Sequence, residues 1–395
     1  IGQSNGTVGT DATTALGSGT LTVQPHNVTA RGIEDSKNIA ALISAGTDGL
    51  ILSNNISLAA ERLDIGGDNA LRLTGTISGS GELYLGEEST SGLTVTLSSH
   101  NTFAGGVYVS RNTTVLVDHN NALGTGPLAF GVPIPSDSPI VKFSTTAPVL
   151  GGLSSPNYAT LRLLEAGTTL TINQPSELEH GNRFVGAINT VDNAAALLVK
   201  SGPGTLRLEG KDDGDYDYGF YASGLTTNTP DGSRDVLMEV RDGRLVLGKD
   251  FTLSDTSSTL WVNGGDLVID GASLSNPILA STGRFAGHGS LPNFSITGGA
   301  SFSPGALGEG ARIGSASVNH VTFGTDAILE WDIASTVDSS LRDHLNIGAT
   351  ATLEITATTT DPWVIRPVTL SSIGVNGLLD GFDATSSYSW ELLTY

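Results

Sequence analysis

Residues 99–130, SHNTFAGGVYVSRNTTVLVDHNNALGTGPLAF, carry the pattern that decides the fold. Apolar residues recur at period two within the runs VYV and VLV, which is the spacing of a β-strand, and the valines concerned are Val107, Val109, Val115 and Val117. Gly105, Gly106 and Asn112 separate these runs at points where the backbone must turn. No helical face fits this spacing, so the stretch predicts short strands joined by short turns.

The end of this stretch has an earlier copy in the chain. The run ALGSGTL at 15–21 matches ALGTGPL at 122–128. Internal repetition is typical of solenoids, which lengthen by adding coils. The chain has 395 residues but only 6% aromatic residues, so it suits a narrow core of stacked aliphatic side chains better than one wide core.

Strands this short, without helices between them, can pair in parallel only if the chain winds as a β-helix. Antiparallel hairpins are the alternative. Runs such as LIL, LVL and LVI, which are apolar on consecutive residues, favour the coil, because its strands face a buried interior and have neighbours above and below. At roughly 20 to 25 residues a turn, about 16 to 20 turns would stack at roughly 4.8 Å each.

We therefore predict an all-β fold, a parallel β-helix that forms one elongated solenoid over 1–395. Six of the fifteen prolines lie in 127–156, and this indicates an irregular region because proline donates no ladder hydrogen bond. The strand period is also lost in 211–235, which we interpret as an acidic loop insertion. A single helix is predicted at 34–45, EDSKNIAALISA, with Asp35 or Ser36 as its cap and Gly46 at its end.

Composition excludes several classes of protein. The net charge of −21 repels phosphate backbones, so we expect no nucleic-acid partner. No run of 18 apolar residues is present, which predicts no membrane-spanning helix. With no cysteine the chain has neither disulfides nor thiolate sites, and it begins with Ile1, as expected of a processed or excised piece of an exported protein.

Four segments together resemble one known family, namely LVKSGPGTLRLEG (198–210), NTFAGGVYVSRNTTVLV (101–117), NNALGTGPLAF (120–130) and GRFAGHGSLPNFSITGGASFSPG (283–305). They resemble the autotransporter-associated β-strand repeat, found in passenger regions of Gram-negative autotransporters and in related exported repeat proteins. The resemblance implies a right-handed parallel β-helix outside the cell or on the cell surface of a Gram-negative-type bacterium, with an adhesive or structural role. One departure is local, because the family continues after the first segment with N-T-Y-x-G-G, whereas this chain continues with 211–235.

A β-helix can also be a polysaccharide-cleaving enzyme. The polygalacturonase-like order N-T-D, D-D, G-H-G, R-I-K has echoes at 189–192, 212–213, 287–289 and 312–313. A valine interrupts the first echo, and the third, which contains His288, falls where the repeat family has an ordinary G-x-G turn. The spacing does not require carboxylates to converge on one bond within about 10 Å. We predict no catalytic residue, and a polysaccharide lyase or glycoside hydrolase is the alternative.

One candidate metal site lies in the acidic insertion. Asp213, Asp215 and Asp217 alternate as D-G-D-Y-D-Y-G, which approaches a calcium loop whose oxygens converge from every second residue. The glycine is one position late, and Gly224 stands where such a loop has Glu. A solvated acidic loop is therefore favoured over a calcium site, and no other cofactor is predicted.

The two ends of the chain bear on its partners. A solenoid exposes unpaired strand edges at its terminal coils, and neither 1–9 nor the apolar SWELLTY at 389–395 has the pattern of a cap. A chain that ends partway through a longer protein would look the same. We predict a non-catalytic structural or adhesive protein that self-associates, into filaments or a surface layer, or binds surface glycan or protein ligands.

Overall fold

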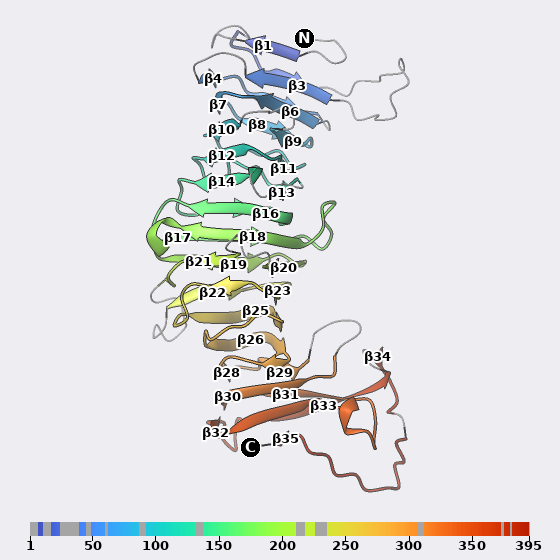
Figure 1. Cartoon of the computed structure of the whole chain (residues 1–395). Helices are drawn as coiled ribbons and strands as arrows, with labels where there is room; N and C mark the ends of the chain where they lie inside the picture. Colours follow the sequence, from blue (N-terminus) through green and yellow to red (C-terminus); the bar gives the residue numbers. More distant parts are fainter. Residues whose placement is uncertain are drawn as a thin grey trace. The chain divides into compact units, whose positions relative to one another are not determined.

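The computed structural model of the chain describes residues 7–10, 17–23, 39–44, 49–59, 62–86, 92–131, 137–210, 218–225, 235–305, 312–372, 375–379 and 381–394. These residues form strands, turns and single-turn 3-10 helices such as η2 (Val191–Asn193) and η3 (Ser339–Leu341), and the described part of the chain has no α-helix. The chain divides into two compact units, 1–196 with 213–221 and 197–212 with 222–395. Within each unit the strands are stacked layer upon layer (Figure 1).

The first unit contains β1 (Thr7–Thr10), β2 (Leu21–Val23), β3 (Ile39–Ser44), β4 (Leu50–Leu52), β5 (Ile56–Leu58), β6 (Arg62–Gly67), β7 (Ala70–Leu73), β8 (Ile77–Gly79), β9 (Leu83–Leu85), β10 (Leu93–Leu97), β11 (Val107–Val109), β12 (Thr113–Val117), β13 (Leu128–Phe130), β14 (Ile140–Phe143), β15 (Val149–Leu150), β16 (Leu153–Leu163), β17 (Thr168–Asn173), β18 (Arg183–Thr190) and β21 (Gly219–Tyr221). The pairings among these strands are all parallel in the described part of the chain, and partners lie about one turn apart in sequence. Leu50, Leu71, Val95 and Val115 are aligned on successive coils, which gives steps of 21, 24 and 20 residues.

Three columns of strands run through these coils. One column contains β4, β7, β10, β12 and β14, a second contains β3, β6, β9, β11 and β13, and a third contains β2, β5 and β8. Alternate side chains point into the space between the columns, and Val95, Val115 and Val141 there are 0% exposed. The parallel pairing of residues one turn apart confirms the predicted all-β, parallel β-helix.

Residues of the repeated sequence motifs link neighbouring coils. Asn101 is buried, its Oδ1 accepts from the backbone N–H of Ile77 at 2.7 Å, and its Nδ2 donates to the carbonyl of Ala122 at 2.6 Å. It therefore joins the coils before and after its own. Gly124 of the ALG element has φ +73°, and a Cβ there would lie 2.4 Å from the Phe103 carbonyl oxygen, so only glycine fits this turn.

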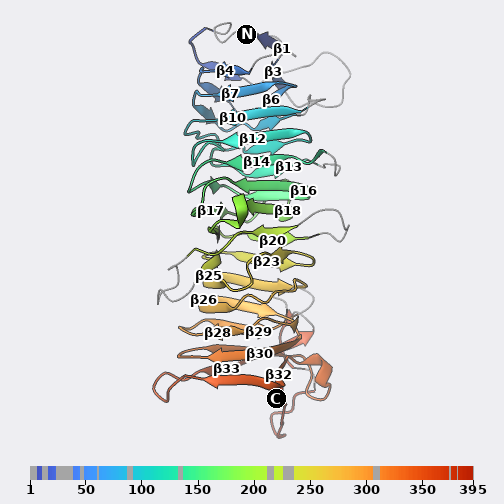
Figure 2. The ribbon, with the colours of Figure 1, turned by 60° about the vertical axis from the view of Figure 1, so that its left-hand side comes forward.

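The second unit contains β19 (Ala196–Ser201, whose first residue belongs to the first unit), β20 (Thr205–Glu209), β22 (Val236–Val240), β23 (Arg244–Gly248), β24 (Thr252–Leu253), β25 (Thr259–Asp270), β26 (Ile278–Gly287), β27 (Gly289–Ser290), β28 (Phe294–Ile296), β29 (Ser301–Pro304), β30 (Ser315–Phe323), β31 (Ile328–Ile333), β32 (His344–Ile355), β33 (Val364–Ser372), β34 (Val375–Asn376) and β35 (Leu393–Thr394). Long strands such as β25 bend from one column into the next, with a register shift at Asn263 and φ +119° at Gly264. The same stacking within the unit is visible from a second side (Figure 2).

Inward side chains of this unit form two aligned core columns. The first runs through Ile278, Phe294, Val321 and Leu353. The second runs through Leu267, Phe285, Phe302, Leu329 and Ile365. The rings of Phe294 and Phe302 are 4.5 Å apart between centroids, so aromatic side chains fill the space between the two columns.

The lysine of LVKSGPGTLRLEG is buried near the end of β19. Lys200 is 0% exposed, and its Nζ donates to the carbonyl oxygens of Ser201, Gly202 and Asp242 at 2.9, 2.8 and 2.9 Å. Burial lowers the pKa of Lys200 to about 8, although the three acceptors match the three N–H bonds of an ammonium group. One side chain thus satisfies carbonyls of two successive coils.

One local prediction was wrong. Residues 39–44 of the predicted helix form β3, which pairs in parallel with β1 and β6, while 34–38 and 45 lie outside the described residues. Pairing with two neighbouring coils, together with burial of Leu42, outweighs the local capping signals.

The two segments singled out as irregular contain strands. β13, β14 and β15 lie within 127–156, where β16 also begins, and Pro156 sits where the register of β16 shifts between Ser155 and Ala159. β21 lies within 211–235, of which 218–225 and Asp235 are described. No helix in the described part of the chain is long and apolar enough to cross a bilayer.

Candidate functional site

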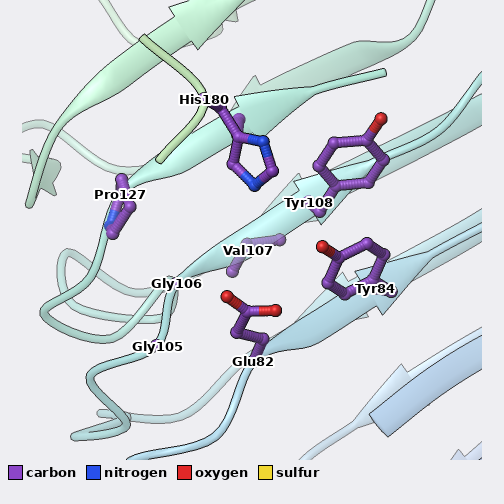
Figure 3. Close-up of a pocket in the computed structure, with 9 residues that line it drawn as sticks. Glu82, Tyr84, Gly105, Gly106, Val107, Tyr108, Pro127 and His180 are labelled. Atoms are coloured by element: carbon purple, nitrogen blue, oxygen red, sulfur yellow. The ribbon is translucent and has the colours of Figure 1, made fainter. Parts of the chain in front are cut away.

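Among the described residues, a hollow lies on the outer face of the coils in each of the two units. The hollow of the first unit, here the tyrosine groove, is lined by Glu82, Tyr84, Gly105, Gly106, Val107, Tyr108, Pro127, Ala129 and His180 (Figure 3). In β9, Leu83 and Leu85 fill the core, so Tyr84 between them points outward. β11 pairs with β9 in register, so Tyr108 occupies the same outward position one coil later.

The tyrosine groove is built around a stack of rings. The centroids of Tyr84 and Tyr108 are 4.6 Å apart, and the His180 ring lies 5.3 Å from Tyr108. The Arg62 guanidinium lies 3.6 Å from the centre of the Tyr84 ring and donates from Nη2 to Asp64 at 3.1 Å. Figure 3 shows the two tyrosine rings one above the other and the exposed His180 beside them.

This stack leaves little ring surface for a ligand. Arg62 and Tyr108 cover the two faces of Tyr84, which is 6% exposed. Burial raises the pKa of Tyr84 to about 12, with Glu82 adding to the shift, and burial also raises the pKa of Tyr108. Both phenols are therefore neutral at pH 7, and the stack joins successive coils.

The hollow of the second unit, here the polar groove, has a volume of about 370 Å³ and is lined by Pro277, Ile278, Asn293, Phe294, Ser295, His320, Thr322 and Glu354. Pairing of β28, β30 and β32 aligns Ser295, Thr322 and Glu354 on three successive coils. Phe294, Val321 and Phe323 fill the core at the alternate positions of these strands and are 0–2% exposed. The outward residues therefore form a polar row over an apolar interior.

Three side chains of the polar groove form a small hydrogen-bonded group. Thr322 Oγ1 donates to Glu354 Oε2 at 3.2 Å and lies 3.3 Å from His320 Nε2. His320 Nε2 and Glu354 Oε2 are 3.9 Å apart, and the two side chains are 41% and 52% exposed. The group is open to solvent, and it offers a carboxylate, a hydroxyl and an imidazole within reach of one ligand.

A network of buried acidic side chains and more exposed arginines lies elsewhere in the second unit. Glu330 contacts Arg284 at 2.6 Å and Arg366 at 3.2 Å, and Asp332 contacts Arg312 at 2.9 Å. Beside Asp332, the carboxyl group of Asp343, a residue that is 1% exposed, accepts from the backbone N–H groups of Gly314 and Asp332 at 2.8 and 2.9 Å.

Burial decides the titration of the two buried aspartates. It raises the pKa of Asp343 to about 9 and also raises the pKa of Asp332. The Trp331 indole donates to the carbonyl of Asp343 at 2.5 Å, so a backbone and a side chain both tie this residue to β31. The network connects strands rather than facing a hollow.

The residues predicted as a metal site, Asp213, Asp215 and Asp217, lie outside the described residues, as does the D-D echo at 212–213. Within the part of the chain that the structure describes, no three His, Cys, Asp or Glu side chains gather closely enough to hold a metal ion.

The remaining enzyme-like echoes have local roles. Thr190 Oγ1 donates to the Tyr221 carbonyl at 3.0 Å, and Asp192 takes a left-handed turn conformation with φ 52°. His288 is exposed between β26 and β27, and Arg312 pairs with Asp332.

Neither groove was predicted from the sequence. The alternation in LYL and VYV places a tyrosine on the outer face, and the alternation in HVTF at 320–323 places polar residues there. Which of these segments lie side by side depends on the register between coils. Comparisons with models of protein families, with curated proteins and with solved structures found no match to this chain. The resemblance to the autotransporter repeat therefore stays a hypothesis based on the motifs themselves.

Proposed function

We propose that this protein is a non-catalytic structural or adhesive β-helix protein that acts outside a Gram-negative-type bacterial cell or on its surface. The observation that carries the proposal is the regular parallel stacking of coils, which holds outward side chains in fixed rows such as Ser295, Thr322 and Glu354. A surface of this kind offers similar contacts on successive coils of a fixed scaffold. The motif resemblance supports the location.

The lining of the polar groove favours binding over reaction. Glycoside hydrolysis ordinarily uses two carboxyl groups that flank the scissile bond. Among the residues that line the polar groove, Glu354 is the single carboxylate. The tyrosine groove likewise has Glu82 as its single lining carboxylate, and burial keeps its tyrosines protonated. An adhesive role therefore has more support than the alternative of a polysaccharide-degrading enzyme.

Self-association belongs to the same proposal. The net charge of −21 opposes association at low salt, so assembly of this chain should strengthen as salt screens the repulsion. Binding to a neutral surface ligand would depend much less on salt.

The test uses the purified chain. We expect it to sediment with an insoluble glycan or with bacterial envelopes, or to assemble in light scattering at raised salt, and to release neither reducing ends nor unsaturated sugars from polysaccharides. Heat-unfolded protein is the control for each assay. Sustained product release, or failure of every binding and assembly assay, would contradict the proposal.

A further inference from the structure

The polar groove has the size and shape of a small-ligand site. Its volume of about 370 Å³ falls within the range of roughly 300–1,000 Å³ that is typical of ligand pockets. Its row of polar residues repeats from coil to coil, at the roughly 4.8 Å spacing of paired strands. That spacing is comparable to the length of one sugar unit, so a linear oligosaccharide could contact a new coil with each residue. We propose that the polar groove binds neutral pyranose oligosaccharides, with Glu354 as the main hydrogen-bond acceptor.

The hydrogen-bonding groups of the groove match sugar hydroxyls. Thr322 bonds one oxygen of Glu354, and no described residue bonds the other, Oε1. A carboxylate can accept from two adjacent hydroxyls of a pyranose, and such charge-assisted hydrogen bonds are stronger than neutral ones. The exposed amide of Asn293 and the half-buried hydroxyl of Ser295 both donate and accept, as a hydroxyl-rich ligand requires.

The wall of the groove provides an apolar surface beside these groups. Pro277 is half-buried and lies next to Ile278 at the start of β26, on the coil before Asn293. A pyranose has an apolar C–H face and a polar rim, so one unit of an oligosaccharide can place its face against Pro277 and its hydroxyls near Asn293, while a later unit reaches Glu354 two coils beyond Asn293. Sites with an apolar lining and a few convergent polar groups are the usual form of a binding pocket.

The charge of the groove selects among sugars. Glu354 is negative, His320 is the single basic side chain in the lining, and the chain as a whole carries −21. A uronate would place its carboxylate close to Glu354 without a lysine or arginine of the lining to compensate. The polar groove therefore favours neutral sugars and disfavours the acidic polymers that the enzyme-like echoes suggested.

This inference rests on the proposed adhesive function and names its ligand class. Isothermal titration calorimetry of the full chain would compare cellotetraose, xylotetraose and mannotetraose with tetragalacturonate. We expect at least one neutral tetrasaccharide to bind and tetragalacturonate to bind at least tenfold more weakly. Glu354→Ala and Asn293→Ala should each weaken the neutral sugar at least tenfold, and Glu354→Gln should weaken it less than Glu354→Ala.

Glu177→Ala is the matched control, because it removes an exposed carboxylate in the first unit and should leave affinity unchanged. Glu354 and Asn293 are exposed, so their variants should keep the circular dichroism spectrum of the parent. Equal affinity of Glu354→Ala and the parent, absence of binding by every neutral sugar, or tighter binding of tetragalacturonate would overturn the inference. The protein could still sediment with envelopes in those cases, and only product release in the same samples would count against the proposed function.

Discussion

Phe302 and Ile365 occupy the same core column of the second unit, yet their environments differ completely. Register places Phe302 next to Leu329 and Leu329 next to Ile365, so all three side chains have equivalent positions on successive coils. Phe302 is 0% and Leu329 is 1% exposed, whereas Ile365 is 43% exposed. Phe302 has a coil on either side, while within the described residues β33 pairs in parallel with β31 and, near Leu370, with β34.

The neighbouring column shows the same change. Phe323 is 0% exposed, and its partner on the next coil, Ile355, is 48% exposed. Among the described residues, the exposed large apolar side chains outside β4 all fall between Val337 and Phe382. In a solenoid, burial of a side chain is thus decided by the coils that flank it, and the alternation of its own strand is not sufficient.

The largest expected effect is on stability, when Phe302, the buried residue of the pair, is truncated. Phe302→Ala should lower the free energy of unfolding by about 3–5 kcal/mol, because it opens a cavity between packed coils. Ile365→Ala should cost less than about 1 kcal/mol, because water already contacts much of that side chain. Urea denaturation of both variants is the measurement. Equal losses would show that the open coil is as well packed as the interior.

Substitution of Lys200 tests how much its buried hydrogen bonds between coils contribute to stability. Lys200→Met should destabilise the chain by about 2–3 kcal/mol, because three buried carbonyls lose their donor. The control is Lys249→Met, since the Lys249 side chain is 76% exposed and its loss should change stability by less than about 0.5 kcal/mol. Thermal unfolding of the two variants in parallel would separate them, and indistinguishable midpoints would contradict a role for the motif lysine.

Asn101 tests the same principle in the first unit. Asn101→Ala removes hydrogen bonds to the coils on both sides and should cost about 2 kcal/mol. Asn173 is exposed at the end of β17, so Asn173→Ala should have little effect. Hydrogen exchange at the Ile77 amide would report the change directly, and unaltered protection there would argue against the assigned bond.

The smallest expected effect, taken per pH unit, is the pH dependence of Asp343. Its folded pKa is raised from 3.8 to about 9, so its contribution to stability is fully present below pH 3.8 and is lost as the pH rises through 9. Relative to Asp343→Asn, which does not titrate, the parent should therefore lose stability steadily between pH 5 and 8, by up to about 1.4 kcal/mol per pH unit. Both proteins share the remaining change in net charge, so the difference isolates Asp343. Parallel pH profiles would show that the two backbone donors keep this carboxylate ionised.

Much of the fold could be predicted because its signals are local. The alternation in VYV and VLV fixes strands β11 and β12, and the conformation required at Gly124 fixes the turn before β13. The helix expected at 34–45 failed for the opposite reason. Its capping residues are also local signals, but β3 is held by pairing with two other coils, which a single segment cannot reveal.

The two grooves depend on register between coils. Tyr84 and Tyr108 stack because β9 and β11 align residue for residue, and Thr322 reaches Glu354 because β30 resumes its pairing with β32 after a shift at His320. Insertions and bulges of one or two residues change such alignments without disturbing the alternation within a strand. The sequence therefore could not show which of these residues meet, although Thr322 and Glu354 could each be assigned to the outward face of a strand.

Residue types and their spacing thus determined the strands, the turns and the parallel β-helix, because these follow from backbone sterics and from the burial of alternate side chains. Tertiary structure decided which inward residues are buried, since Phe302 and Ile365 have equivalent positions in one column but different coils beside them. It also decided which outward residues meet, because the polar groove combines side chains from β28, β30 and β32 whose proximity is set by hydrogen bonding between coils.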